Sequence, residues 1–208
     1  MDSHDDDEVS HPFTEHTTIT NGEILYISNI ASGHGDALIT SPNNSSPIYK
    51  VTSHISIDRS KPKIVLSSDN RAISHLFHHW RTGYKIGVDH RGHGESQMEW
   101  VELKRGGFTA LNKSYSFLWN GKMYVIARMK GSEVSGGSRL LRHYKVIEKD
   151  GGEVVATYVS GEAGGARKGT ITVQRGLDAN LRLVVVTALA EWREMARRQQ
   201  RTAGGVVA

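Results

Sequence analysis

The segment from Leu181 to Trp192 constrains the fold more than any other part of the chain, because it is apolar on every face of a helix. Leu, Val and Ala recur at helical spacing, and Val186 and Ala190 add apolar side chains to the opposite face. Such a helix must be buried all round. Asp178 is a suitable N-cap, and no Gly or Pro follows it before Gln200. We therefore predict a buried helix over about 178–200, with a buried β-strand as the alternative.

The same segment is too short to cross a bilayer. Its apolar run covers only about a dozen residues between charged positions such as Arg182 and Glu191, whereas a membrane-spanning helix needs roughly 20. We therefore expect no transmembrane segment.

The chain before this helix has the pattern of short antiparallel strands. Asn120-Gly121 separates the β-rich runs 115–119 and 122–128, which predicts a hairpin with a type I′ turn. A second hairpin is predicted around Asp150-Gly151-Gly152. The remaining candidate strands cover 24–30, 48–57, 64–67, 72–78, 84–88, 98–104, 143–147, 154–159 and 169–173. The predicted fold is mainly β: a closed antiparallel barrel of about 10–12 strands around the buried C-terminal helix, with a sandwich as the alternative.

The order of these elements resembles the tubby C-terminal-like superfamily, which includes tubby, the LURP-one-related proteins and the phospholipid scramblases. The residues that carry the resemblance are 116–124, 153–158, 169–173 and the helix over 183–198. Small tubby-like proteins of filamentous fungi are the most similar group. The resemblance implies a non-enzymatic barrel whose better-known members act at membranes through phosphoinositides or other phospholipids.

Charge is distributed unevenly along the chain. Five of the first ten residues are acidic, and without them 26 Lys and Arg face 17 Asp and Glu. An acidic start lacks the basic and apolar regions of a secretory signal. The absence of cysteine excludes disulfides, thiolate-bound zinc, iron–sulfur clusters and cysteine nucleophiles. We expect an intracellular, cytoplasmic protein with peripheral membrane association, in which one domain over 21–200 lies between an acidic tail (1–20) and a short tail (201–208).

Basic residues gather in three places, and a cationic surface would suit anionic lipid headgroups. The candidate lipid-binding residues are Arg59, Lys61 and Lys63, then Arg139, Arg142 and Lys145, and finally Arg167, Lys168 and Arg175. The alternative interpretation is that these side chains only solvate the outer face of the barrel.

The segment Val88–Ser96 is similar to the D-x-R-G-H-G-x-S stretch of α/β-hydrolases. That chemistry also requires a G-x-S-x-G nucleophile elbow, and the chain contains none. We therefore predict a Gly-rich loop between two strands and name no catalytic residue.

Histidine is abundant, with 11 residues in the chain, and several lie close together in sequence. The candidate metal ligands are His75, His79, His90 and His93, whose imidazoles suit Zn²⁺, Ni²⁺ or Cu²⁺. The alternative is that they are solvated or half-buried histidines without a metal, so no cofactor is expected.

Nucleic-acid binding is not expected, because the chain has no RNP-like strand, helix-turn-helix or Cys/His finger. The four tryptophans, Trp80, Trp100, Trp119 and Trp192, are predicted to lie in the core. The leading hypothesis is a non-catalytic module that binds phosphoinositide headgroups or a protein partner. The alternatives are a metal-dependent or hydrolytic enzyme that uses the His75–His93 region, and a purely structural scaffold.

Overall fold

The computed structural model describes residues 19, 21–30, 36–54, 58, 60–79, 83–89, 91, 93–106, 114–130, 133, 143–161 and 169–204. The side chains of residues 45, 79, 95, 197 and 199–204 are not included in that description. The predicted tail over 1–20 lies outside the described residues except for Ile19, and the end of the chain is described as far as Gly204.

Twelve strands and one long helix make up the described structure. The strands are β1 (Gly22–Asn29), β2 (Ala37–Ser41), β3 (Asn44–Ser53), β4 (Ile64–Ser68), β5 (Arg71–His79), β6 (Gly83–Val88), β7 (Glu99–Gly106), β8 (Ser114–Trp119), β9 (Lys122–Arg128), β10 (Tyr144–Glu148), β11 (Val154–Ser160) and β12 (Gly169–Gln174). A 3₁₀ turn, η1 (Glu95–Gln97), precedes β7, and the helix α1 spans Ala179–Gly204.

The strands close into a barrel in which each pairs antiparallel with its neighbours in sequence. The ring is completed by β1 and β12, which pair from Gly22 opposite Gln174 to Tyr26 opposite Thr170. Closure of this kind leaves no exposed sheet edge. The predicted fold, a closed antiparallel barrel with one C-terminal helix, is confirmed.

Two tight hairpins follow directly from the turn residues. Asn120 and Gly121, between β8 and β9, both have positive φ (47° and 79°), as a type I′ turn requires. Asp69 and Asn70 adopt the same left-handed region (48° and 62°) between β4 and β5. Asn and Asp tolerate this region better than other residues with a Cβ atom, which explains their presence at both turns.

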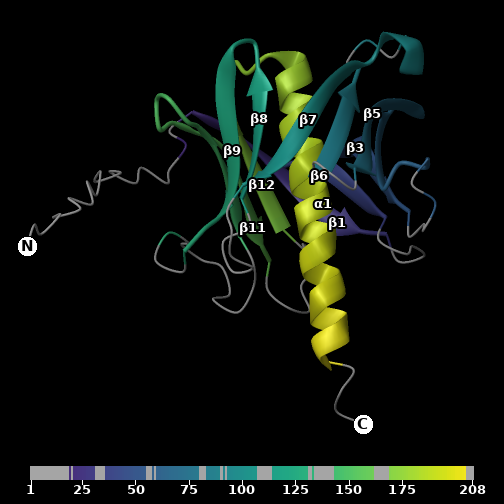
Figure 1. The fold of residues 1–208 in the computed structure, drawn as a ribbon. Coiled ribbons are helices and arrows are strands. Elements are labelled where there is room, and N and C mark those ends of the chain that lie inside the picture. Colours follow the sequence, from purple (N-terminus) through teal and green to yellow (C-terminus); the bar gives the residue numbers. More distant parts are fainter. Residues whose placement is uncertain are drawn as a thin grey trace, which may run out of the picture.

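The helix runs through the middle of the barrel and projects beyond the strands at its C-terminal end (Figure 1). Every side chain from Leu183 to Glu194 is buried, which confirms that this segment is surrounded on all faces. The hydroxyl of Thr187 donates to Ser74 of β5 at 2.9 Å, so the polar group inside the barrel has a partner. Burial of the apolar residues contributes roughly 1.5–3 kcal/mol for each Leu or Val, which makes α1 the centre of the core.

Asp178 caps the helix as predicted. Its Oδ1 accepts the backbone N–H groups of Asn180 and Leu181, both at 3.0 Å. At the other end the helix continues to Gly204, four residues beyond the predicted end near Gln200. No Gly or Pro occurs in the helix before Gly204, so it contains no strong helix breaker that would end it earlier.

The sequence prediction missed one strand and misplaced one tryptophan. β2 has only five residues and lies between turn-rich segments, so its strand pattern is weak. Trp100 was predicted to be in the core, but it lies on the outer face of β7 and is 40% exposed. Its ring covers Gly87, where a Cβ atom would lie 2.8 Å from the indole. Trp119 and Trp192 are buried as predicted, and Trp80 lies outside the described residues.

Candidate functional site

The two ends of the barrel differ in their connections. One end, which we call the hairpin end, has the turns at 42–43, 69–70, 120–121 and 149–153, the longer β6–β7 connection and the start of α1. The opposite end, the helix-exit rim, is formed by the ends of β1, β3, β5, β7, β9 and β11, by the starts of the strands that follow them, and by the C-terminal part of α1. The helix therefore carries its basic C-terminal sequence out through this rim.

The helix-exit rim is basic where the structure describes it. Its exposed cationic residues are Lys61, Lys104, Arg105, Arg128 and Lys130, and its exposed acidic residues are Asp58 and Glu102. Arg198 of α1 adds a guanidinium whose side chain is 31% exposed. A surplus of positive charge at one end of a barrel creates a local potential that attracts polyanions.

The sequence-predicted basic residues fall into separate environments. Lys61 is exposed at the helix-exit rim, whereas Arg175 is exposed at the hairpin end, after β12. Lys63 is directed inward, with its Nζ 3.9 Å from Glu191 Oε1, and Lys145 is buried with its Nζ 3.1 Å from Glu133 Oε1. The other candidates, Arg59, Arg139, Arg142, Arg167 and Lys168, lie outside the described residues. The structure thus brings Lys61, Lys63 and Lys145 to the rim end, where Lys63 faces Glu191 and Lys145 forms an ion pair with Glu133.

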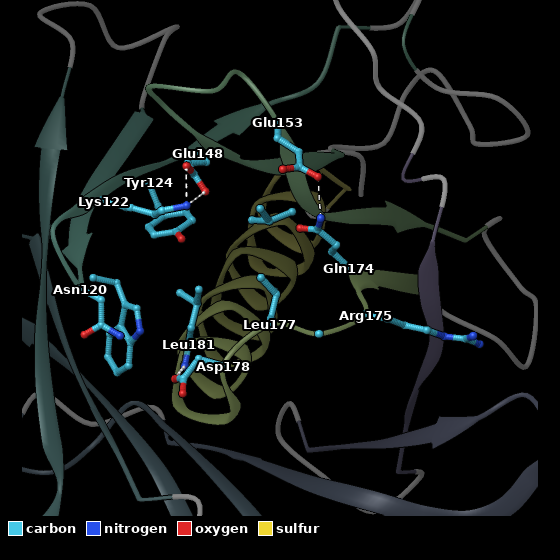
Figure 2. A pocket seen from close by; sticks show the side chains of 13 residues that line it. Asn120, Lys122, Tyr124, Glu148, Glu153, Gln174, Arg175, Leu177, Asp178 and Leu181 are labelled. Carbon is cyan, nitrogen blue, oxygen red and sulfur yellow. Dashed lines mark hydrogen bonds and ion pairs between the residues drawn. The ribbon is translucent and has the colours of Figure 1, made fainter.

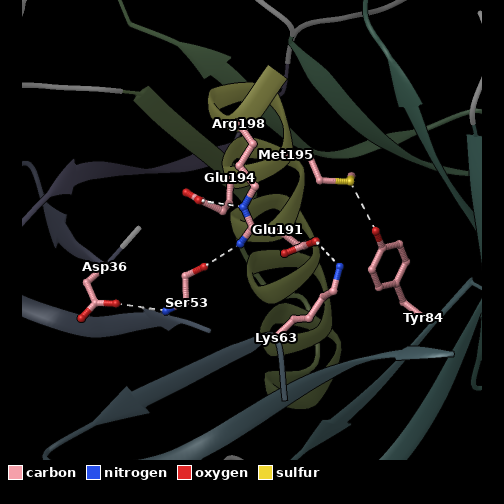
Figure 3. Close-up of polar contacts among 8 residues, drawn as sticks. All are labelled: Asp36, Ser53, Lys63, Tyr84, Glu191, Glu194, Met195 and Arg198. Atoms are coloured by element: carbon pink, nitrogen blue, oxygen red, sulfur yellow. Dashed lines mark hydrogen bonds and ion pairs between the residues drawn. The ribbon is translucent and has the colours of Figure 1, made fainter. Parts of the chain in front are cut away.

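A chain of polar contacts links the helix to the barrel wall just inside this rim (Figure 3). Arg198 Nε lies 3.1 Å from Glu194 Oε1, and its Nη2 donates to Ser53 Oγ at 3.2 Å. The backbone N–H of Ser53 donates to Asp36 Oδ1 at 3.1 Å. The prediction of an apolar, buried helix did not include these polar contacts, although Glu191 and Glu194 lie within the predicted helix.

Glu191 has the most perturbed carboxyl group of this cluster. Its side chain is fully buried, and burial raises its pKa from 4.5 to about 7, although the cations of Lys63 and Arg198 act in the opposite direction. Burial also raises the pKa of the neighbouring Tyr84 hydroxyl, with the Glu191 charge as the second cause. That hydroxyl donates to Met195 Sδ at 3.3 Å.

The raised pKa of Glu191 predicts a specific pH dependence of stability. The folded state binds this proton more tightly than the unfolded state, so the free energy of unfolding falls as pH rises from 4.5 to about 7. Between fully protonated and fully ionised Glu191, the free energy of unfolding falls by about 3 kcal/mol. The variant Glu191→Gln, which resembles the protonated form, should match the parent protein near pH 5 and exceed its stability above pH 7. Urea denaturation of both proteins at the two pH values measures this, and a difference that does not change with pH would contradict it.

The hydrolase-like motif forms a structural loop. Asp89, which follows β6, is buried, and its two carboxylate oxygens accept the backbone N–H groups of Arg91 and Gly94, both at 3.0 Å. Burial acts to raise the pKa of Asp89, but hydrogen bonds from the backbone of Gly94, Arg91 and His93 outweigh it and lower the pKa. The carboxylate thus organises the turn that leads to η1, in agreement with the predicted Gly-rich loop between two strands.

The two candidate metal ligands whose side chains the structure describes, His75 and His93, are not part of a metal-binding cluster. His75 is buried on β5 with its ring 6.2 Å from that of Phe77, and His93 is half-exposed with its Nδ1 3.5 Å from Asp89 Oδ1. The side chain of His79 and the whole of His90 lie outside the described residues. Among the residues that are described, no three His, Asp or Glu side chains are grouped closely enough to hold a metal ion.

Comparison with known proteins gives no match to any protein-family model, to any curated protein or to any solved structure. Within the described part of the chain, no helix combines the length and the apolar character that crossing a bilayer requires.

Proposed function

We propose that the protein is a non-catalytic module that binds anionic phospholipid headgroups, phosphoinositides among them, through the helix-exit rim. The observation that carries the proposal is the surplus of exposed cations there: Lys61, Lys104, Arg105, Arg128 and Lys130 against Asp58 and Glu102. The resemblance to tubby-like proteins points to the same class of ligand.

The expected strength of this interaction follows from the charges. Each Lys or Arg close to an anionic membrane surface contributes about 1 kcal/mol, so a surplus of this size gives weak binding that several cations must share. At an ionic strength of about 0.1 M the screening length is roughly 10 Å, and at about 1 M it is only roughly 3 Å. Binding through the rim should therefore weaken strongly as salt is added.

The structural role of Asp89 favours lipid binding at the rim over the alternative of a hydrolytic enzyme. In the hydrolase-like motif this carboxylate already accepts two backbone N–H groups and fixes the turn. The rim, in contrast, presents charged side chains that are exposed to solvent.

Co-sedimentation with vesicles tests the proposal. The full chain should pellet with phosphatidylcholine vesicles that contain phosphatidylserine or a phosphoinositide, and should remain in the supernatant with phosphatidylcholine alone. The rim variant Lys61→Glu/Arg128→Glu should reduce the partition coefficient by more than about tenfold, because two attractive charges become repulsive.

A matched control separates the rim from the total charge. The variant Arg71→Glu/Arg175→Glu makes the same change of charge at the hairpin end, where both residues are exposed. It should bind vesicles almost as well as the parent protein. Failure of the parent chain to pellet with any anionic vesicle, or an equal loss in both double variants, would overturn the proposal.

A further inference from the structure

A pocket lies at the hairpin end, at the opposite end of the barrel from the rim. This pocket of about 360 Å³ opens between the β8–β9 hairpin, the β10–β11 hairpin and the start of α1 (Figure 2). Its volume falls in the range of roughly 300–1,000 Å³ that is usual for small-molecule sites. Leu181 and Val155, both buried, form part of its lining.

One wall of the pocket is fixed by an ion pair. Lys122 Nζ lies 2.9 Å from Glu148 Oε1 and 3.1 Å from Oε2, so the two charges neutralise each other. Beside them, the buried ring of Tyr124 stacks on Phe117 with the ring centroids 5.3 Å apart. These contacts hold the wall in place before any ligand enters.

Trp119 supplies the observation that points to a ligand. It lines the pocket and is only 5% exposed, yet its indole Nε1 has no hydrogen-bond partner among the residues that the structure describes. A buried N–H group without an acceptor is unfavourable, and such groups in folded proteins are usually satisfied. A ligand that presents an oxygen acceptor to this indole would remove the penalty.

Two further lining residues supply acceptors: Glu153, which lies beside Glu148 on the β10–β11 hairpin, and Asp178, at the start of α1 (Figure 2). Glu153 Oε1 accepts from the Gln174 amide, and Asp178 Oδ1 accepts from the start of the helix. Within the described part of the chain, the second oxygen of each carboxylate accepts no hydrogen bond. The residues that line the pocket therefore include one indole N–H donor without an acceptor and carboxylates that can accept further hydrogen bonds.

The charges and hydrogen-bonding groups that line the pocket indicate which class of ligand it can bind. The lining carries three carboxylates (Glu148, Glu153 and Asp178) against two cations (Lys122 and Arg175), so an anion such as phosphate is disfavoured. A simple cation would leave the Trp119 N–H without an acceptor. A hydroxyl group both accepts from an indole N–H and donates to a carboxylate. We propose that this pocket binds a neutral polyhydroxylated ligand, that is, a mono- or disaccharide or a cyclic polyol.

The indole N–H resonances of the four tryptophans provide the readout. The full-length ¹⁵N-labelled protein is titrated with glucose, a disaccharide and inositol, and in parallel with inorganic phosphate and with choline. One indole resonance, the one that Trp119→Phe removes, should shift saturably with a neutral probe, with a dissociation constant on the order of 1 mM for a ligand this small.

Two variants test whether the ligand binds at Trp119. Trp119→Phe removes the donor but keeps an aromatic ring, and should weaken binding by about tenfold or more, as measured by calorimetry. Trp100→Phe, on the outer face, is the matched control and should have no effect. If Trp119→Phe does not fold, Glu153→Ala at an exposed position should give a several-fold loss. Vesicle binding through the rim should be unchanged in all of these variants.

Two kinds of result would contradict sugar or polyol binding in this pocket. The proposal is overturned if no neutral polyhydroxylated probe shifts the Trp119 resonance, or if only phosphate or choline does. It is also overturned if Trp119→Phe folds and binds the sugar as tightly as the parent protein.

Discussion

Replacement of Trp192 by alanine is expected to lower the free energy of unfolding by about 3–5 kcal/mol, a large part of the stability of a typical domain. Trp192 lies on α1 inside the barrel and is 2% exposed. Its ring centroid is 4.9 Å from that of Tyr115 and 5.4 Å from that of Tyr84, so it joins the helix to β8 and β6. Truncation leaves a cavity that the closed barrel has little freedom to fill.

Urea denaturation of Trp192→Ala and of Trp100→Ala tests this prediction. Trp100 is 40% exposed on the outer face, where it contacts Phe77 and the Lys85 ammonium, 4.7 Å from its ring. Its removal should cost only about 1 kcal/mol. Equal losses in the two variants would show that α1 is not enclosed as described.

Replacement of Glu133 by alanine is expected to cost about 3–5 kcal/mol, because it leaves the ammonium of Lys145 buried without its counter-ion. The two side chains are only 10% and 4% exposed, and their charged atoms are 3.1 Å apart. A buried charge that loses its partner keeps the full cost of desolvation.

Glu148→Ala is the matched control, since Lys122 and Glu148 are also a Lys–Glu pair at hydrogen-bonding distance. The Lys122 side chain is 58% exposed, so water replaces the lost carboxylate and the effect should be much smaller. The double variant Glu133→Ala/Lys145→Met should recover much of the stability lost in Glu133→Ala. If Glu133→Ala is no more harmful than Glu148→Ala, the Lys145 charge is not buried in solution.

The parts of the fold that could be predicted are those that local chemistry determines. Asn120-Gly121 specifies its own turn, Asp178 caps the helix that follows, and the apolar faces of 181–192 require burial. β2 could not be found in this way. Its five residues form a strand because β1 and β3 supply partners on both sides.

The sites depend on contacts between residues that are distant in sequence, which explains why less of them could be predicted. Lys63 was recognised as basic, but its partner Glu191 is on α1, and only the closed barrel brings the two together. The pocket at the hairpin end is assembled from two hairpins and the start of the helix. Because its residues share no short motif, no pattern in the sequence indicated that Trp119 and Glu153 line one pocket.

The proposed function requires that the helix-exit rim, and not the hairpin end, faces an anionic membrane. The chain has no cysteine, so a single environment-sensitive fluorophore can be placed at Ser60→Cys on the rim or at Asp150→Cys at the hairpin end, both exposed positions. With vesicles that contain phosphoinositide, the label at position 60 should shift its emission to the blue, while the label at position 150 should not change. A shift at position 150 alone, or at neither position, would rule out membrane binding through the rim.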